Sequence, residues 1–167
     1  IIDFALYDME AEKPITLVRQ KTRITPEMFV NPLMVFANYI FDTVSHDSFT
    51  VHENKLYELR VTLETEEANI EGVRPIDMEK VNVEHSVVEI RTPNYYNDTV
   101  LDNILALYKN ELKETSFLLP IGSIRAIKLL RKLTNDKLFI ISTDKGYGSL
   151  ENLENLGHPS VAFHGSF

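Results

Sequence analysis

The chain of 167 residues contains no cysteine, and its basic residues are fewer than its acidic ones, with 17 Lys and Arg against 25 Asp and Glu. The lack of cysteine excludes a disulfide, a thiolate metal site and a cysteine nucleophile. A formal charge of −8 argues against nucleic acid as the main partner. No apolar run approaches the ~18–20 residues of a membrane helix. We therefore expect a cytoplasmic protein that binds neither nucleic acid nor membrane.

Apolar residues make up 44% of the chain and charged residues 25%, which is the balance of a soluble globular protein. The length suffices for one ordinary domain with a hydrophobic core. The chain opens with Ile1-Ile2-Asp3 and has neither an initial methionine nor a secretory signal. We interpret it as a piece of a longer protein that starts and ends inside a fold.

The region 123–148 predicts a helix, a short turn, a buried strand and a polar loop. Ser123 is a candidate N-cap, and apolar residues follow at helical spacing up to Leu133. Asn135-Asp136 predicts the turn, and the unbroken apolar run 138–141 is typical of a strand buried on both faces. This order is half of a βαβ unit and predicts an α/β fold with a mostly parallel sheet and flanking helices.

Two further apolar runs, 1–6 and 33–37, predict buried strands, and each of the three strands is followed by an acidic loop. The acids are Asp8, Asp42 and Asp144. If the strands are parallel, these loops share the edge of the sheet where ligands bind. The pattern favours a small-molecule site with polar anchors. The alternative is that these acids are solvated turn and capping residues.

Residues 49–91 change the pattern, because apolar and polar side chains alternate along 57–63. That period is typical of a half-buried antiparallel strand, so we expect a β insertion at about 49–91. Asn97-Asp98 predicts the cap of a helix that runs to Leu112. The five histidines form no cluster with carboxylates at metal spacing, and no Gly-x-Ser-x-Gly motif occurs. We predict no metal site.

Three segments carry a resemblance to a family: FALYDME, NPLMVFANYIFDTVSHDSF and LFIISTDKGYG. They resemble the class I S-adenosylmethionine-dependent methyltransferases, and most closely the MidA-like branch. That branch has a strand that leads into an Asn-Glu-x-x-Asp-type loop, to which the present segment 37–42 is similar. It also has an Asp-Tyr-Gly-Tyr-type loop, to which segment 143–148 is similar. The resemblance covers about half of the chain.

The resemblance implies that residues 1–167 are the C-terminal part of one Rossmann-like methyltransferase domain with S-adenosylmethionine as cofactor. A protein side chain is one candidate acceptor. Asp8 would accept from the adenine amino group, and Met9 would lie against the ring. The implied catalytic residues are Asn38, Tyr39 and Asp42, with Asn38 also touching the cofactor. The implied substrate-side residues are Asp47, Asp144 and Tyr147.

Two departures from the family keep other functions open. Tyr39 stands where the branch usually has an acid, and the Gly-rich loop after the first strand of the fold is absent. A catalytically silent methyltransferase-like binding or scaffold domain is therefore the alternative function. An α/β binding module unrelated to the family is a third possibility. The sequence makes no prediction of the oligomeric state or of the acceptor.

Overall fold

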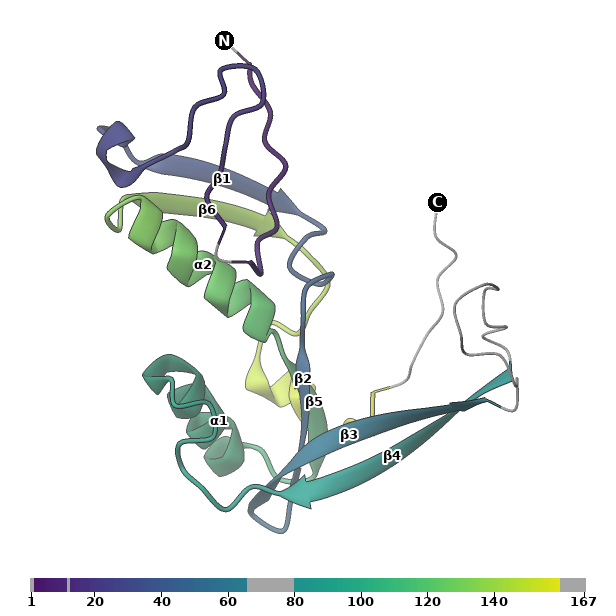
Figure 1. Ribbon diagram of the computed structural model, residues 1–167. Helices are drawn as coiled ribbons and strands as arrows, with labels where there is room; N and C mark the ends of the chain where they lie inside the picture. The colour runs from purple at the N-terminus through teal and green to yellow at the C-terminus, as the bar shows by residue number, and fades with distance from the viewer. Residues whose placement is uncertain (1, 12, 66–79, 160–167) are drawn as a thin grey trace. The chain divides into compact units, whose positions relative to one another are not determined.

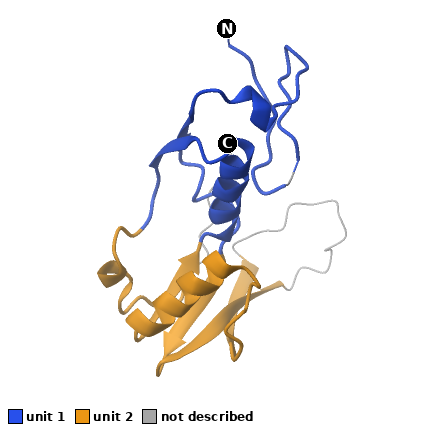
Figure 2. Ribbon diagram, turned by 90° about the vertical axis from the view of Figure 1, so that its left-hand side faces the viewer, with its two compact units in different colours: residues 1–46, 120–146 blue, residues 47–119, 147–167 orange. Residues whose placement is uncertain are grey.

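The computed structural model describes residues 2–11, 13–65 and 80–159. The chain forms two compact units, which Figure 2 colours separately. The first unit comprises residues 1–46 and 120–146, and the second comprises residues 47–119 and 147–167. The chain therefore leaves the first unit after His46 and returns to it at Pro120.

The first unit is built on two parallel strands, β1 (Leu33–Asn38) and β6 (Leu138–Thr143). Their register runs from Leu33 opposite Leu138 to Asn38 opposite Thr143, so the two strands end side by side. Helix α2 (Ile121–Leu133) precedes β6 and lies alongside the pair (Figure 1). A short 3₁₀ helix, η1 (Pro26–Met28), precedes β1.

One face of this parallel pair is apolar and open to solvent. Side chains alternate between the faces of a strand, and Ala37 lies on the buried face of β1. Four large apolar side chains on the opposite face are exposed: Met34, Phe36, Phe139 and Ile141. The first unit therefore buries only one side of its small sheet.

The second unit contains a four-stranded antiparallel sheet in the order β4-β3-β2-β5. The strands are β2 (Asp47–His52), β3 (Lys55–Thr65), β4 (Val81–Glu89) and β5 (Thr115–Leu119). Glu53 and Asn54 join β2 to β3 with φ values of 48° and 58°, as a two-residue hairpin turn requires. Helix α1 (Thr99–Glu111) and the 3₁₀ helix η3 (Leu150–Leu153) complete this unit.

The second unit holds a packed apolar core. Phe49 is 0% exposed, and its ring lies 5.7 Å from the rings of both Tyr95 and Phe117. Tyr108 of α1 packs edge-on against Phe117 at 4.9 Å, which joins the helix to the sheet. The other buried apolar residues of this unit are Val51, Leu56, Leu59, Leu101, Leu105, Leu112 and Leu119.

Helix α1 begins as the sequence predicts. The side chain of Asp98 accepts hydrogen bonds from the N–H groups of Val100 and Leu101. The buried carboxylate of Asp102 accepts from the N–H groups of Tyr96 and Asp98. Asp98 thus satisfies two N–H groups that the first helical turn leaves without intrahelical partners, and Asp102 reaches back to two N–H groups just before the helix.

The prediction of a Rossmann-like, mostly parallel sheet with flanking helices is wrong. Among the described residues there are two α-helices, one parallel pair and one antiparallel sheet. Residues 2–6 form no strand. Phe4 O accepts from Val18 N–H, and the Asp3 carboxylate accepts from the N–H groups of Arg19 and Gln20. These bonds tie the apolar run 2–6 to residues 18–20, so it does not extend the sheet.

The positions of the other predicted strands are confirmed, but the expected burial of strand 138–141 on both faces is wrong, because Phe139 and Ile141 are exposed. Segments 33–37 and 138–141 are parallel neighbours, and the described residues of the predicted β region form antiparallel strands within 49–65 and 81–89. The antiparallel sheet also contains β5, which lies outside the predicted insertion, follows α1 in the chain and pairs with β2 at one edge of the sheet. No helix in the described parts of the chain has the length and apolar character needed to cross a membrane.

Candidate functional site

The ends of β1 and β6 form the centre of a polar cluster in the first unit. Asn38 is the last residue of β1, and its Oδ1 accepts a hydrogen bond from the hydroxyl of Thr143, the last residue of β6. The N–H of Tyr39 donates to the Thr143 carbonyl at 3.0 Å. Parallel pairing thus brings two polar loops together, 105 residues apart in the sequence. We call the loops 8–11, 38–45 and 143–145 the strand-end site.

Asp144 fixes the loop that follows β1. Its Oδ2 accepts from the N–H groups of Ile40 at 3.2 Å and Phe41 at 2.8 Å, and its Oδ1 accepts from the N–H of Lys145. Burial acts to raise the pKa of Asp144, but these N–H groups and an interaction with Asp42 outweigh it. The pKa of Asp144 therefore lies below its usual value. This carboxylate is charged at neutral pH.

A third loop and the start of α2 join the same cluster. Glu10 Oε1 accepts from the N–H of Ser45 at 3.0 Å, and the Ser45 carbonyl accepts from the N–H of Gly122 at 3.0 Å. The Ser123 hydroxyl donates to the Phe41 carbonyl at 3.0 Å. The loop 38–45 is therefore held from three sides within the first unit.

Gly122 allows α2 to approach the loop closely. A Cβ atom at this position would lie 2.9 Å from Val44 Cβ and 3.0 Å from the Ser45 nitrogen. Both distances are tighter than ordinary carbon contacts. A glycine in a helix costs roughly 1 kcal/mol relative to alanine. Here the missing side chain is required by the packing of the loop.

Tyr39 is held in an unusual backbone conformation. Its φ is 50°, in the left-handed region that residues other than glycine rarely adopt. Its side chain is 59% exposed. A strained backbone at an exposed aromatic residue is a feature that occurs at ligand sites.

The structure brings together some of the residues singled out from the sequence. Asn38, Tyr39, Asp42 and Asp144 lie in the joined loops. Asp8 and Met9 lie in a turn of the first unit, where Asp8 Oδ1 accepts from the N–H of Glu10 at 3.1 Å. No hydrogen bond within the described chain links Asp8 directly to Asn38 or Tyr39.

The remaining two predicted residues belong to the second unit. Asp47 begins β2, and its Oδ2 accepts from the hydroxyl of Tyr96 at 2.6 Å. Tyr147 follows the loop after β6 and is exposed. Asp47 therefore has a structural bond inside the second unit.

Sequence reasoning missed three residues that shape the strand-end site: Glu10, Gly122 and Ser123. The prediction of Ser123 as an N-cap is wrong, because α2 starts at Ile121 after Pro120 and Ser123 lies inside the helix. Its hydroxyl instead bonds to the loop. The one available signal was a glycine within a helical pattern, which often has a packing reason.

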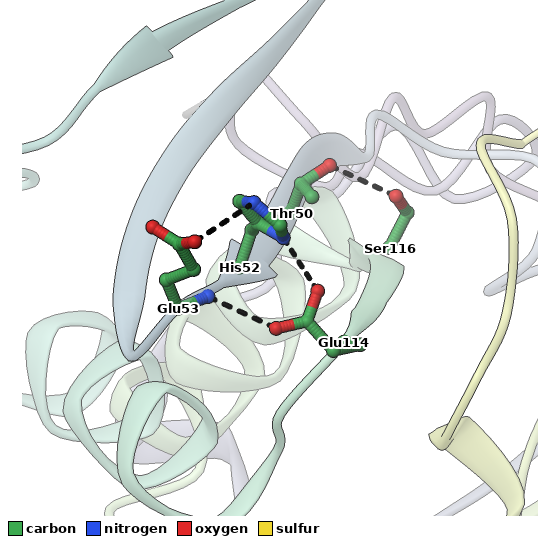
Figure 3. Close-up of polar contacts among 5 residues, drawn as sticks. All are labelled: Thr50, His52, Glu53, Glu114 and Ser116. Atoms are coloured by element: carbon green, nitrogen blue, oxygen red, sulfur yellow. Dashed lines mark hydrogen bonds and ion pairs between the residues drawn. The ribbon is translucent and has the colours of Figure 1, made fainter.

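A second polar cluster lies at the hairpin turn between β2 and β3 (Figure 3). His52 Nδ1 lies 2.5 Å from Glu114 Oε2, and Glu114 Oε1 accepts from the N–H of Glu53 at 3.0 Å. Nearby, the hydroxyls of Thr50 and Ser116 share a hydrogen bond of 2.8 Å. The hydrogen bond with Glu114 raises the pKa of His52. This cluster links the hairpin turn to the start of β5.

The strand-end site offers four carboxylates (Asp8, Glu10, Asp42 and Asp144), an exposed aromatic ring and an amide. The described residues contain no group of three His, Asp or Glu side chains placed to hold a metal ion. Carboxylates and an aromatic face suit a ligand with positive charge. Comparisons with protein-family models, curated proteins and solved structures find no match to this chain.

Proposed function

We propose that the chain takes part in S-adenosylmethionine-dependent methyl transfer at the strand-end site of the first unit. One observation carries the proposal. The two segments with the strongest resemblance to the family, 37–42 and 143–148, meet through Asn38, Asp144 and their hydrogen bonds at the ends of two parallel strands. The proposal rests on these loops and not on a Rossmann-like sheet.

The charge of the site fits the cofactor. S-adenosylmethionine supplies a methyl group activated on a positively charged sulfur atom. Asp42 and Asp144 provide negative charge beside the loop, and the exposed ring of Tyr39 offers a face for a cation. Asp8 is exposed and uses only Oδ1 in its turn. Its other carboxylate oxygen suits the adenine amino group.

In this proposal, Asp144 and Asn38 position the loop and the methyl acceptor. Asp144 orders the loop through the N–H groups of Ile40 and Phe41, which fixes the backbone next to Tyr39. Asn38 uses its oxygen to accept from Thr143, which leaves its amide N–H groups to donate to an acceptor. Alignment of the acceptor is the main contribution that a protein makes to methyl transfer. A protein side chain is the acceptor class that the family resemblance implies.

Calorimetric titration with S-adenosylhomocysteine tests the proposal. We expect the chain to bind it. In a parallel titration with S-adenosylmethionine, whose sulfur is positively charged, Asp42→Asn should weaken binding because one negative charge is removed beside the site. The matched control is Glu151→Gln, which removes one exposed charge from the second unit. Absence of binding by the unchanged chain refutes the proposal, and so does equal weakening by both variants.

The second candidate is a catalytically silent binding domain. It is favoured by the way the polar groups of the site bond to one another, as Asn38 does to Thr143 and Asp144 does to the loop. Such groups also serve to hold a loop without any chemistry. The test is methyl transfer from labelled cofactor to a cellular protein fraction. Transfer that is lost in Asp8→Ala would show that the chain is an enzyme. Binding without transfer decides for the silent domain.

A further inference from the structure

A cavity of the first unit is lined by Tyr7, by residues of the segment 13–26 and by the C-terminal part of α2. Its volume is about 360 Å³, which lies within the range of small-molecule pockets. Apolar side chains line much of it, among them Ile24, Leu129 and Leu133. This region is folded by a hairpin in which Thr16 bridges to Arg23 and the N–H of Ile24 donates to Ile15 O.

The charge of this cavity is opposite to that of the chain. Three basic residues line it, Lys13, Arg23 and Lys132, and no Asp or Glu is among its described lining residues. The chain as a whole carries a formal charge of −8. Three cations and no acid therefore make a local positive region on an acidic protein.

Within the described residues, these three cations have no charged partner. No ion pair or side-chain hydrogen bond joins Lys13, Arg23 or Lys132 to an acid in the parts that the structure describes. By contrast, Arg131, next in sequence to Lys132, pairs with Asp136 at 2.7 Å. Basic groups that surround an apolar hollow without acids suit a ligand with a negative head and an apolar body.

We propose that this cavity binds an aliphatic carboxylate of medium chain length. The carboxylate pairs with the basic groups, and Arg23 offers a fork that matches both of its oxygens. The aliphatic chain lies against Ile24, Leu129 and Leu133 and loses its contact with water. The proposed binding does not depend on methyl transfer, because no residue of the strand-end loops lines the cavity.

Calorimetric titrations with octanoate, octanol and butyrate test this proposal. Octanoate should bind more tightly than octanol, which lacks the charge, and more tightly than butyrate, which lacks the longer apolar chain. Lys132→Gln and Arg23→Gln should each weaken octanoate binding about tenfold, the effect of losing one charge-assisted hydrogen bond. The matched control is Lys113→Gln, because Lys113 is an exposed lysine of the second unit.

Four results would overturn the proposal: no binding of octanoate, equal binding of octanol, equal weakening by Lys113→Gln, or binding of an acidic peptide with no binding of octanoate. The last result would assign the basic groups to a protein partner. Circular dichroism of each variant shows whether it is folded. The Arg23 and Lys132 side chains are exposed, so both variants should fold.

Discussion

The two units of the chain differ in the interactions that stabilise each of them internally. The second unit buries Phe49 and its neighbours between an antiparallel sheet and α1. The first unit buries few large side chains and is joined at the strand-end site by hydrogen bonds among loops. It also exposes the apolar face that contains Phe36 and Phe139. The comparison indicates that the second unit contributes most of the stability. The first unit holds the polar groups that suit a ligand.

Truncating one phenylalanine in each unit tests this difference in stability most strongly. Phe49→Ala should lower the free energy of unfolding by about 3–5 kcal/mol, because a fully buried ring leaves a cavity. Phe36→Ala is the matched control in the first unit. Phe36 is 72% exposed, so its truncation should change stability by less than about 0.5 kcal/mol. Urea unfolding measures both, and equal losses would contradict the comparison.

Gly122→Ala tests the close approach of α2 to the loop 38–45. Alanine is the better helix former, which alone would stabilise the chain by about 1 kcal/mol. The new Cβ would meet Val44 and the Ser45 backbone, and overpacking of this kind costs about 1–3 kcal/mol. We expect a net loss of stability in thermal unfolding. A gain in stability would show that the loop moves aside without cost.

Much of the secondary structure could be predicted from the sequence, because periodicity reports which faces are buried. Alternation along 57–63 predicted β3, and Asp98 predicted the start of α1. The apolar run 138–141 predicted a strand with a parallel neighbour. These features depend on local pattern and capping, which a single sequence contains.

The errors arose where distant segments decide the structure. The run 2–6 is as apolar as a strand, yet its partners are the N–H groups of residues 18–20. Ser123 has the chemistry of an N-cap, yet its hydroxyl bonds to Phe41, 82 residues away. The site was predicted in part, since Asn38 and Asp144 do meet. Glu10 and Gly122 were missed because their role exists only in the folded loop.

Tyr39→Gly separates stability from ligand binding in the first unit. Tyrosine at a φ of 50° carries a conformational cost of about 1–2 kcal/mol that glycine avoids. We expect the variant to gain up to about 1 kcal/mol of stability and to bind S-adenosylhomocysteine more weakly. Asn54→Gly, at a φ of 58° in the second unit, is the control and should leave binding unchanged. Unaltered binding by the Tyr39 variant would show that the Tyr39 ring does not contact the ligand.

The smallest effect concerns His52 and Glu114 in the second unit. The Glu114 carboxylate raises the pKa of His52 above 6.5, and the Glu53 N–H and His52 lower the pKa of Glu114 below 4.5. Between pH 4.5 and 6.5, His52 is therefore protonated and Glu114 ionised, so the ion pair between them is fully formed. Its contribution disappears as pH rises through the raised pKa of His52 or falls through the lowered pKa of Glu114.

Titration by NMR should place the pKa of His52 above 6.5 and return it toward that value in Glu114→Gln. Glu53→Gln is the control, since Glu53 lies 4.0 Å from the ring and has the smaller influence. A larger shift in the Glu53 variant than in the Glu114 variant would reject this assignment. Because both side chains are exposed, the two variants should unfold close to the unchanged chain.

Amide hydrogen exchange with and without S-adenosylhomocysteine is the most direct test of the strand-end site. The N–H groups of Ile40 and Phe41 donate to Asp144, and a ligand held by this loop should slow their exchange. We predict added protection in residues 38–45 and 143–145, and no change in the core strands β2 and β5 of the second unit. Unchanged exchange in these loops, or protection confined to the second unit, would contradict the account.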